Sequence, residues 1–147
     1  LLQCDEPFNA GPMHYVFARA VRALDAWVDN GTPPPVAPRL DLNDDGTAFL
    51  LDDLGNVTGG IRTPYVDAPS AVLSGEGQTG GSFCFLFGTT RLFDPAEMAS
   101  LYVDRQGYVN AVLGSAADAV RADFLLPEDA AAIIEWAPQQ WDDQVGP

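Results

Sequence analysis

Lysine is absent from this sequence, and all seven of its basic residues are arginines. They stand against 21 acidic residues, which gives a net charge of −14. A protein that binds nucleic acid needs a basic patch to neutralise phosphates, so we expect no nucleic-acid partner. An anionic membrane surface repels such a chain, so we expect no membrane partner either. A P-loop is excluded because its phosphate-binding lysine is missing.

Cysteine and long apolar runs are scarce too. Cys4 and Cys84 are too few for a disulfide framework and lack metal-ligand spacing, and the sequence leaves open whether they are free thiols or one long-range bridge. No apolar run approaches the ~20 residues of a membrane-spanning helix. The chain opens at Leu1 without an initiator methionine or the features of a signal peptide, so we interpret this opening as a cut inside a longer protein. The localisation therefore stays unknown.

What the sequence does contain is enough for a core, since 47% of its residues are hydrophobic and 10% are aromatic. The clearest element is an amphipathic helix from about Pro12 to Asp29, with Gly31 suited to the left-handed position after its end. Its apolar side chains recur at helical spacing and are Met13, Val16, Phe17, Ala20, Val21, Leu24, Trp27 and Val28. A proline-rich arm follows at 32–40 and predicts extended polyproline geometry.

The remainder predicts short strands followed by helices. Two apolar runs, 48–51 and 57–62, are typical of a hairpin, and the aromatic run 83–87 predicts a buried strand. Asp94, followed by Pro95 and Glu97, predicts a capped helix up to about residue 102. Further helices are expected over about 105–122 and from Pro127 to just before Pro138.

Motifs for catalysis and phosphate binding are missing or incomplete. The nucleophile elbow G-x-S-x-G is absent, and its nearest approach, Gly80 to Cys84 around Ser82, ends in cysteine and enters a predicted strand. Gly75 to Gly80 fits the dinucleotide pattern G-x-G-x-x-G, but a helix should follow such a loop. We interpret it as a surface loop.

An acidic loop is the best candidate for a metal site. Its oxygen-bearing side chains and glycine match positions 1, 3, 5, 6 and 12 of a calcium loop. They are Asp41, Asn43, Asp45, Gly46 and Asp52. A proline arm replaces the preceding helix of an EF-hand, and aspartate replaces the usual terminal glutamate. A tight acidic turn is therefore the preferred interpretation, with calcium binding as the alternative.

Two single residues also invite a functional interpretation. His14 is the only histidine and has no nucleophile as a partner in this chain, so a structural role is preferred to a catalytic one. Arg62 lies between Gly60 and Pro64, and we expect it to form a structural ion pair with Asp67 in preference to binding substrate.

Several segments together resemble the C-terminal region of a bacterial family of α/β hydrolase domain proteins. The matching segments are Cys4 to Asn9, Gly11 to Val16, Ala23 to Val28, Gly31 to Pro35, Gly55-Asn56, Gly59 to Asp67 and Phe83 to Gly88. The resemblance implies a mostly parallel sheet wrapped by helices and a Ser-His-acid triad that cleaves esters or related acyl bonds. It also implies that the triad histidine lies upstream of Leu1, so no catalytic role is carried over to His14.

The fold class expected is therefore an α/β-hydrolase C-terminal segment, which is α+β as an isolated chain. Residues 1–31 would end with the last helix of the hydrolase core, 32–40 would form the arm, and 41–147 a C-terminal extension. We assign no catalytic, cofactor-binding or metal-binding residue and no cofactor to this chain. The expected partners are the remainder of the hydrolase and, in the whole protein, a small ester-like substrate. The alternative function is a non-enzymatic binding module with a calcium loop at 41–52.

Overall fold

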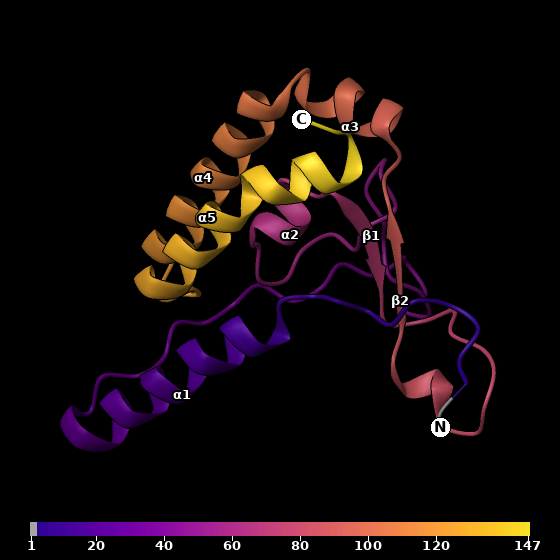
Figure 1. The fold of residues 1–147 in the computed structure, drawn as a ribbon. Helices are drawn as coiled ribbons and strands as arrows, with labels where there is room; N and C mark the ends of the chain where they lie inside the picture. Colours follow the sequence, from indigo (N-terminus) through magenta and orange to yellow (C-terminus); the bar gives the residue numbers. More distant parts are fainter. Residues whose placement is uncertain (1–2) are drawn as a thin grey trace.

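The computed structural model describes residues 3–147, which fold into helices with one small sheet (Figure 1). The elements in chain order are α1 (Met13–Asn30), α2 (Pro64–Asp67), β1 (Ala71–Ser74), η1 (Cys84–Leu86), β2 (Thr89–Leu92), α3 (Pro95–Tyr102), α4 (Arg105–Arg121) and α5 (Pro127–Gln144). Strands β1 and β2 pair antiparallel, with Ala71 opposite Leu92. The expected α+β character is therefore present. Within residues 3–147, no helix is both long and apolar enough to cross a bilayer.

The core forms where α4 and α5 pack on each other and on α2, α3 and the β1–β2 hairpin. Its largest fully buried side chains include Tyr108, Met98 and Leu125. Helix α3 begins as predicted, because the Asp94 carboxylate accepts the amides of Ala96 and Glu97 while Glu97 accepts the amide of Asp94. The C-terminal half of the chain thus contains its own hydrophobic core.

The prediction that the last helix stops before Pro138 is wrong, because α5 continues through that proline to Gln144. A proline inside a helix costs about 3 kcal/mol, since it removes a hydrogen bond and crowds the preceding turn. Tertiary contacts beyond the proline offset this cost. Trp141 is buried in the core, and the Asp142 carboxylate accepts two hydrogen bonds from Arg105, at 2.8 and 2.9 Å.

The predicted buried strand at 83–87 is also wrong. This segment contains the single 3₁₀ turn η1 with Phe83 and Phe87 on either side of it, and of its five residues only Cys84 is buried. The strand of this region is β2, which begins two residues later and pairs with β1. The run of aromatic residues therefore marks an exposed apolar surface and not a core strand.

The predicted hairpin over 48–62 forms no regular strands. Isolated bridges pair Leu42 with Phe49, Leu51 with Val57, and Leu40 with Gly59. Asn56 joins this segment to the sheet, because its fully buried side chain donates to the Ala71 carbonyl and accepts the Leu73 amide. One buried asparagine thus fixes this irregular segment against β1.

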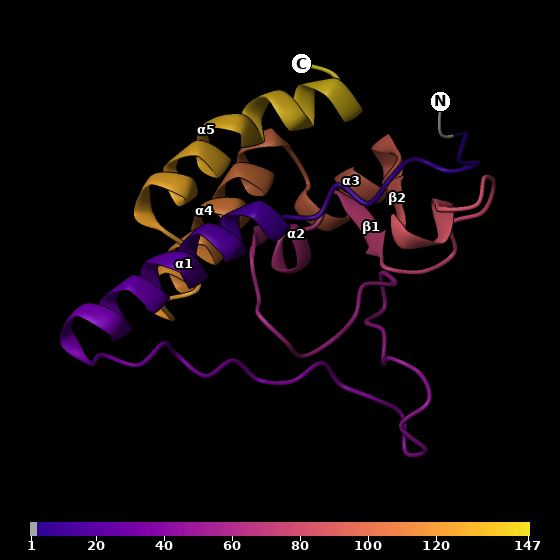
Figure 2. The ribbon, with the colours of Figure 1, turned by 90° about the horizontal axis from the view of Figure 1, so that it is seen from below.

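Helix α1 is attached to the rest of the molecule by its less apolar side. It ends as predicted at Gly31, which has a φ of 77°. Within α1, Ala23 alone is buried, and Arg19 turns inward to pair with Asp123 beyond the end of α4. The apolar side chains face solvent and are Met13, Phe17, Val21, Leu24, Trp27 and Val28. Figure 2 shows the helix and the proline-rich arm after it running along the outside of the molecule.

Candidate functional site

A cavity of about 460 Å³ lies between the start of α1, α2, the β1–β2 hairpin and α5. Its volume falls within the range of small-molecule pockets. Its lining residues come from several parts of the fold, among them the stretch just before α1, helix α4 and the second half of α5. The aromatic, amide and acidic side chains of its walls include Tyr15, Tyr65, Trp136, Gln140, Asp143 and Gln144.

Aromatic rings and a hydrogen-bonded chain shape the walls. The rings of Tyr15 and Tyr65 lie 6.5 Å apart between centroids, and Trp136 adds an indole from α5. The Tyr108 hydroxyl donates to Gln140 Oε1 at 2.8 Å, and Gln140 Nε2 donates to the Ser70 hydroxyl at 2.7 Å. These contacts fix the amide of Gln140, so that the walls combine a partnered amide with aromatic and aliphatic side chains.

The cavity has a defined electrostatic character. No arginine is among its lining residues, and the carboxylate of Asp143 is the only acidic group there. Burial raises the pKa of Tyr108 to about 12, and burial together with the neighbouring Tyr15 raises the pKa of Tyr65. Both phenols are therefore neutral at pH 7. The side chains lining the cavity thus carry a single negative charge.

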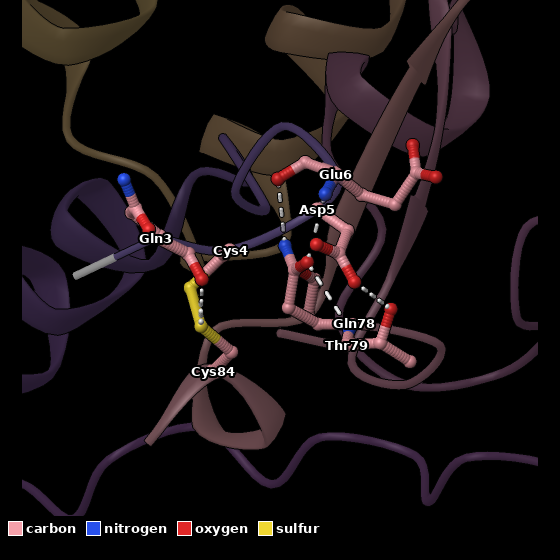
Figure 3. Close-up of a disulfide and its surroundings, with 8 residues drawn as sticks. Gln3, Cys4, Asp5, Glu6, Gln78, Thr79 and Cys84 are labelled. Carbon is pink, nitrogen blue, oxygen red and sulfur yellow. Dashed lines mark hydrogen bonds between the residues drawn. A yellow bond between two sulfur atoms is a disulfide. The ribbon is translucent and has the colours of Figure 1, made fainter. Parts of the chain in front are cut away.

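Residues 3–11, here called the N-terminal strap, are tied to the loop that joins β1 to β2. Cys4 and Cys84 form a disulfide, which settles the question that the sequence left open. Beside the disulfide, which Figure 3 shows with its surroundings, the Gly81 amide donates to the Gln3 carbonyl and the Asp5 amide donates to the Thr79 carbonyl. The strap is thereby held against a segment about 80 residues away in sequence.

Gln78 is the central side chain of this junction. It is 6% exposed, and its Nε2 donates to the carbonyls of Glu6 and Gly88 while its Oε1 accepts the Glu6 amide. The glycine-rich stretch Gly75 to Gly80 therefore surrounds a buried polar anchor. The next element is the short 3₁₀ turn η1 and not an α-helix that begins at the loop, so the dinucleotide-binding context is missing in the structure.

Arg62 forms the ion pair expected for it. Its guanidinium contacts the Asp67 carboxylate at 2.6 Å and donates to the carbonyls of Val57 and Val66. Gly59 and Gly60 both have positive φ, and a side chain on Gly59 would meet the Arg39 carbonyl at 2.5 Å. Arg62 and these glycines hold residues 57–67 in one conformation. The pair is about one third exposed, and so less buried than the sequence indicated.

Replacing Arg62 by alanine should lower the free energy of unfolding by about 1 kcal/mol, because two backbone acceptors and one carboxylate lose their donor. Thermal unfolding should show a drop of roughly 3 °C in the midpoint for a chain of this size. Arg121→Ala is the matched control, since the pair of Arg121 with Asp118 is far more exposed and should change the midpoint little. An equal effect of the two substitutions would contradict a structural role for Arg62.

The other residues weighed from the sequence do not converge on one site. Ser82 is exposed in the loop before η1, and His14 is exposed in the first turn of α1, beside the ring of Tyr15. No hydrogen bond joins these two side chains in the part of the chain that the structure describes. They therefore do not form a nucleophile–base pair in this structure.

The acidic loop uses its side chains to hold its own turns. Asn43 Oδ1 accepts the amides of Thr47 and Ala48, and Asp52 Oδ1 accepts those of Leu54 and Asn56. Across residues 3–147, no three side chains of histidine, cysteine, aspartate or glutamate cluster as metal ligands would. These contacts describe two capped turns, and calcium binding stays an untested alternative.

Sequence reasoning missed the cavity and the two buried polar anchors, Gln78 and Asn56. The anchors had a detectable signal, because each is a lone amide side chain next to a glycine in an otherwise irregular segment. No pattern in the sequence indicated the cavity. Its walls come from residues between Ala10 and Gln144, and only the tertiary fold brings them together.

Comparison with known proteins gives one match. The sequence model of a protein family described as "Alpha/beta hydrolase domain" matches residues 1–135. No curated protein and no solved structure matches the chain. The matched span includes the strap, α1, the sheet, α4 and the first half of α5.

Proposed function

The chain belongs to the family of proteins with an α/β hydrolase domain, and on that premise we propose that it is the non-catalytic C-terminal part of a hydrolase. The whole protein would cleave esters or related acyl bonds with a serine nucleophile held outside these 147 residues. The family assignment supports a hydrolase, and the absence of an elbow motif from this sequence supports a non-catalytic role.

The observation that carries this proposal is the orientation of α1. A helix on the surface of a soluble protein normally turns its apolar stripe inward and its charges outward. In α1 the apolar stripe instead faces outward, since Phe17 is 67% exposed and Trp27 is 52% exposed, while one charged side chain, that of Arg19, faces inward and is 15% exposed. An exposed apolar stripe of this length marks a surface that another polypeptide covers. We propose that the catalytic part of the same hydrolase covers it.

The apolar turn η1 supports the same assignment. Phe83, Phe85 and Leu86 are all more than half exposed, although most of their surface is apolar. The disulfide at Cys84 holds this turn next to the strap. Helix α1 and η1 thus present two apolar surfaces, joined through the strap, against which a catalytic part can pack.

The isolated chain should not turn over p-nitrophenyl acetate or butyrate, because it has no activated serine. The assay measures p-nitrophenolate release, with Ser82→Ala as the control for the serine that most resembles a nucleophile. Turnover by the chain that disappears in Ser82→Ala would overturn the non-catalytic role.

A further inference from the structure

The cavity beside Tyr15, Tyr65 and Trp136 has the chemistry of a binding site in its own right. It is built wholly from residues of this chain, and none of the exposed apolar residues of α1 named above lines it. The docking of a catalytic part on α1 and the binding of a molecule in this cavity are therefore separate properties. The chain can dock through α1 without binding a ligand in the cavity, and it can bind a ligand without docking.

The charges of the lining residues and of the whole chain limit which ligands the cavity can bind. The lining residues include no arginine and one carboxylate, that of Asp143, and the chain as a whole carries a net charge of −14. An anionic ligand would meet no cation in the cavity and would be repelled from the molecule. A cation would be attracted by both the local and the overall charge.

The aromatic rings in the walls of the cavity limit the class of ligand further. Tyr15, Tyr65 and Trp136 offer ring faces, and a cation within about 6 Å of such a face is attracted by the negative potential of the ring. The remaining walls, which include Pro64, Leu92 and Ile133, suit an apolar body. A ligand that joins a cationic head to an aromatic or aliphatic body matches both surfaces.

One polar atom indicates a head group that donates hydrogen bonds. Gln144, a lining residue in the last turn of α5, donates through Nε2 to the Ser70 carbonyl at 3.3 Å. Its Oε1 accepts no hydrogen bond from any group within residues 3–147. This oxygen is buried, and rotation of the partly buried side chain, with loss of its bond to Ser70, would present it to a donor in the cavity. Asp143, the residue before Gln144 in α5, supplies the opposite charge, and one oxygen of its carboxylate accepts a hydrogen bond from Gln139 Nε2 at 2.7 Å.

We propose that this cavity binds small organic ammonium ions, with the apolar body between Tyr15, Tyr65 and Trp136 and the ammonium group towards Asp143 and Gln144. The matched probes are benzylammonium, the neutral benzyl alcohol and the anion benzoate, because they share one ring and differ in charge. Ligand-observed NMR titration of the chain gives the three dissociation constants. Benzylammonium should bind tightest and benzoate weakest.

Two pairs of variants locate the site. Asp143→Asn should weaken benzylammonium binding by about fivefold, whereas Glu135→Gln, which removes one charge from an exposed position of α5 outside the cavity, should change it by less than about twofold. Trp136→Ala should weaken binding by about fivefold, while Trp27→Ala on α1 should leave it unchanged. Circular dichroism confirms that each variant folds.

Several results would overturn the proposal. If benzyl alcohol binds as tightly as benzylammonium, the positive charge contributes nothing and the cavity binds apolar molecules in general. Asp143→Asn and Glu135→Gln having the same effect would place the ion elsewhere, and the absence of benzylammonium binding would leave no site at all. Loss of binding in the whole hydrolase would show that polypeptide covers the cavity. None of these outcomes bears on whether the chain hydrolyses esters, so the proposed function is tested separately.

Discussion

Replacing Cys4 and Cys84 together by serine is expected to lower the free energy of unfolding by about 4 kcal/mol. The bridge closes a loop with a sequence separation of 80, and a loop of this length restricts the unfolded chain strongly. Without the bridge, the strap is held by hydrogen bonds alone, such as those of Gln78 to Glu6 and Gly88. Urea denaturation followed by circular dichroism measures the change.

The double variant also provides the control for a reducing agent. Dithiothreitol should lower the urea midpoint of the original chain to that of the double variant, and it should leave the double variant unchanged. Using both serines avoids a single free thiol that would form disulfides between molecules. Two alkylatable thiols in the chain isolated under air, or a midpoint that ignores the reductant, would contradict the bridge.

The isolated chain is expected to associate in solution through the apolar side of α1. Phe17, Leu24 and Trp27 are each more than half exposed and lie along one side of the helix. They belong to a continuous apolar patch, and patches of several hundred Å² drive association. Sedimentation velocity should show a mass that rises with concentration.

Two aspartates on that side should return the chain to a monomer. The double variant Phe17→Asp and Leu24→Asp places two more negative charges where copies would meet, and it should keep its helical content because both positions are exposed. Asp25→Ala alters a neighbouring exposed position of the same helix that lies outside the apolar side, and it should leave association unchanged. A chain that stays monomeric at every concentration would count against an uncovered docking surface.

Residue spacing and capping patterns predicted correctly those elements that are determined by contacts between residues close in sequence. The spacing of apolar residues and the glycine after them placed α1 to within a residue at each end, and Gly31 has the expected left-handed backbone. Asp94 and Glu97 formed the capping box that their spacing indicated. Arg62 found Asp67, five residues away. In each case the deciding contacts lie within a few residues of one another.

The wrong predictions concern segments whose conformation is determined by contacts with residues far away in the sequence. The aromatic run around Cys84 looked like a buried strand, yet the disulfide to Cys4 and the strap fix it as an exposed turn. Pro138 looked like a helix terminator, yet Trp141 and Asp142 make contacts beyond it that keep α5 intact. Apolar character coincides with burial at Val112 and Ala116 of α4, but not along the outer side of α1 or at η1. That difference is understandable if α1 and η1 are covered by polypeptide outside these residues.

The central claim is that α1 docks this chain onto the catalytic part of a serine hydrolase. The most direct test is the esterase activity of the whole reading frame that encodes it, with Leu24→Asp compared with Asp25→Ala. Leu24→Asp should abolish or strongly reduce p-nitrophenyl ester hydrolysis, because a charge at the centre of the apolar contact separates the two parts. Asp25→Ala should retain it. Full activity in Leu24→Asp would contradict the claim.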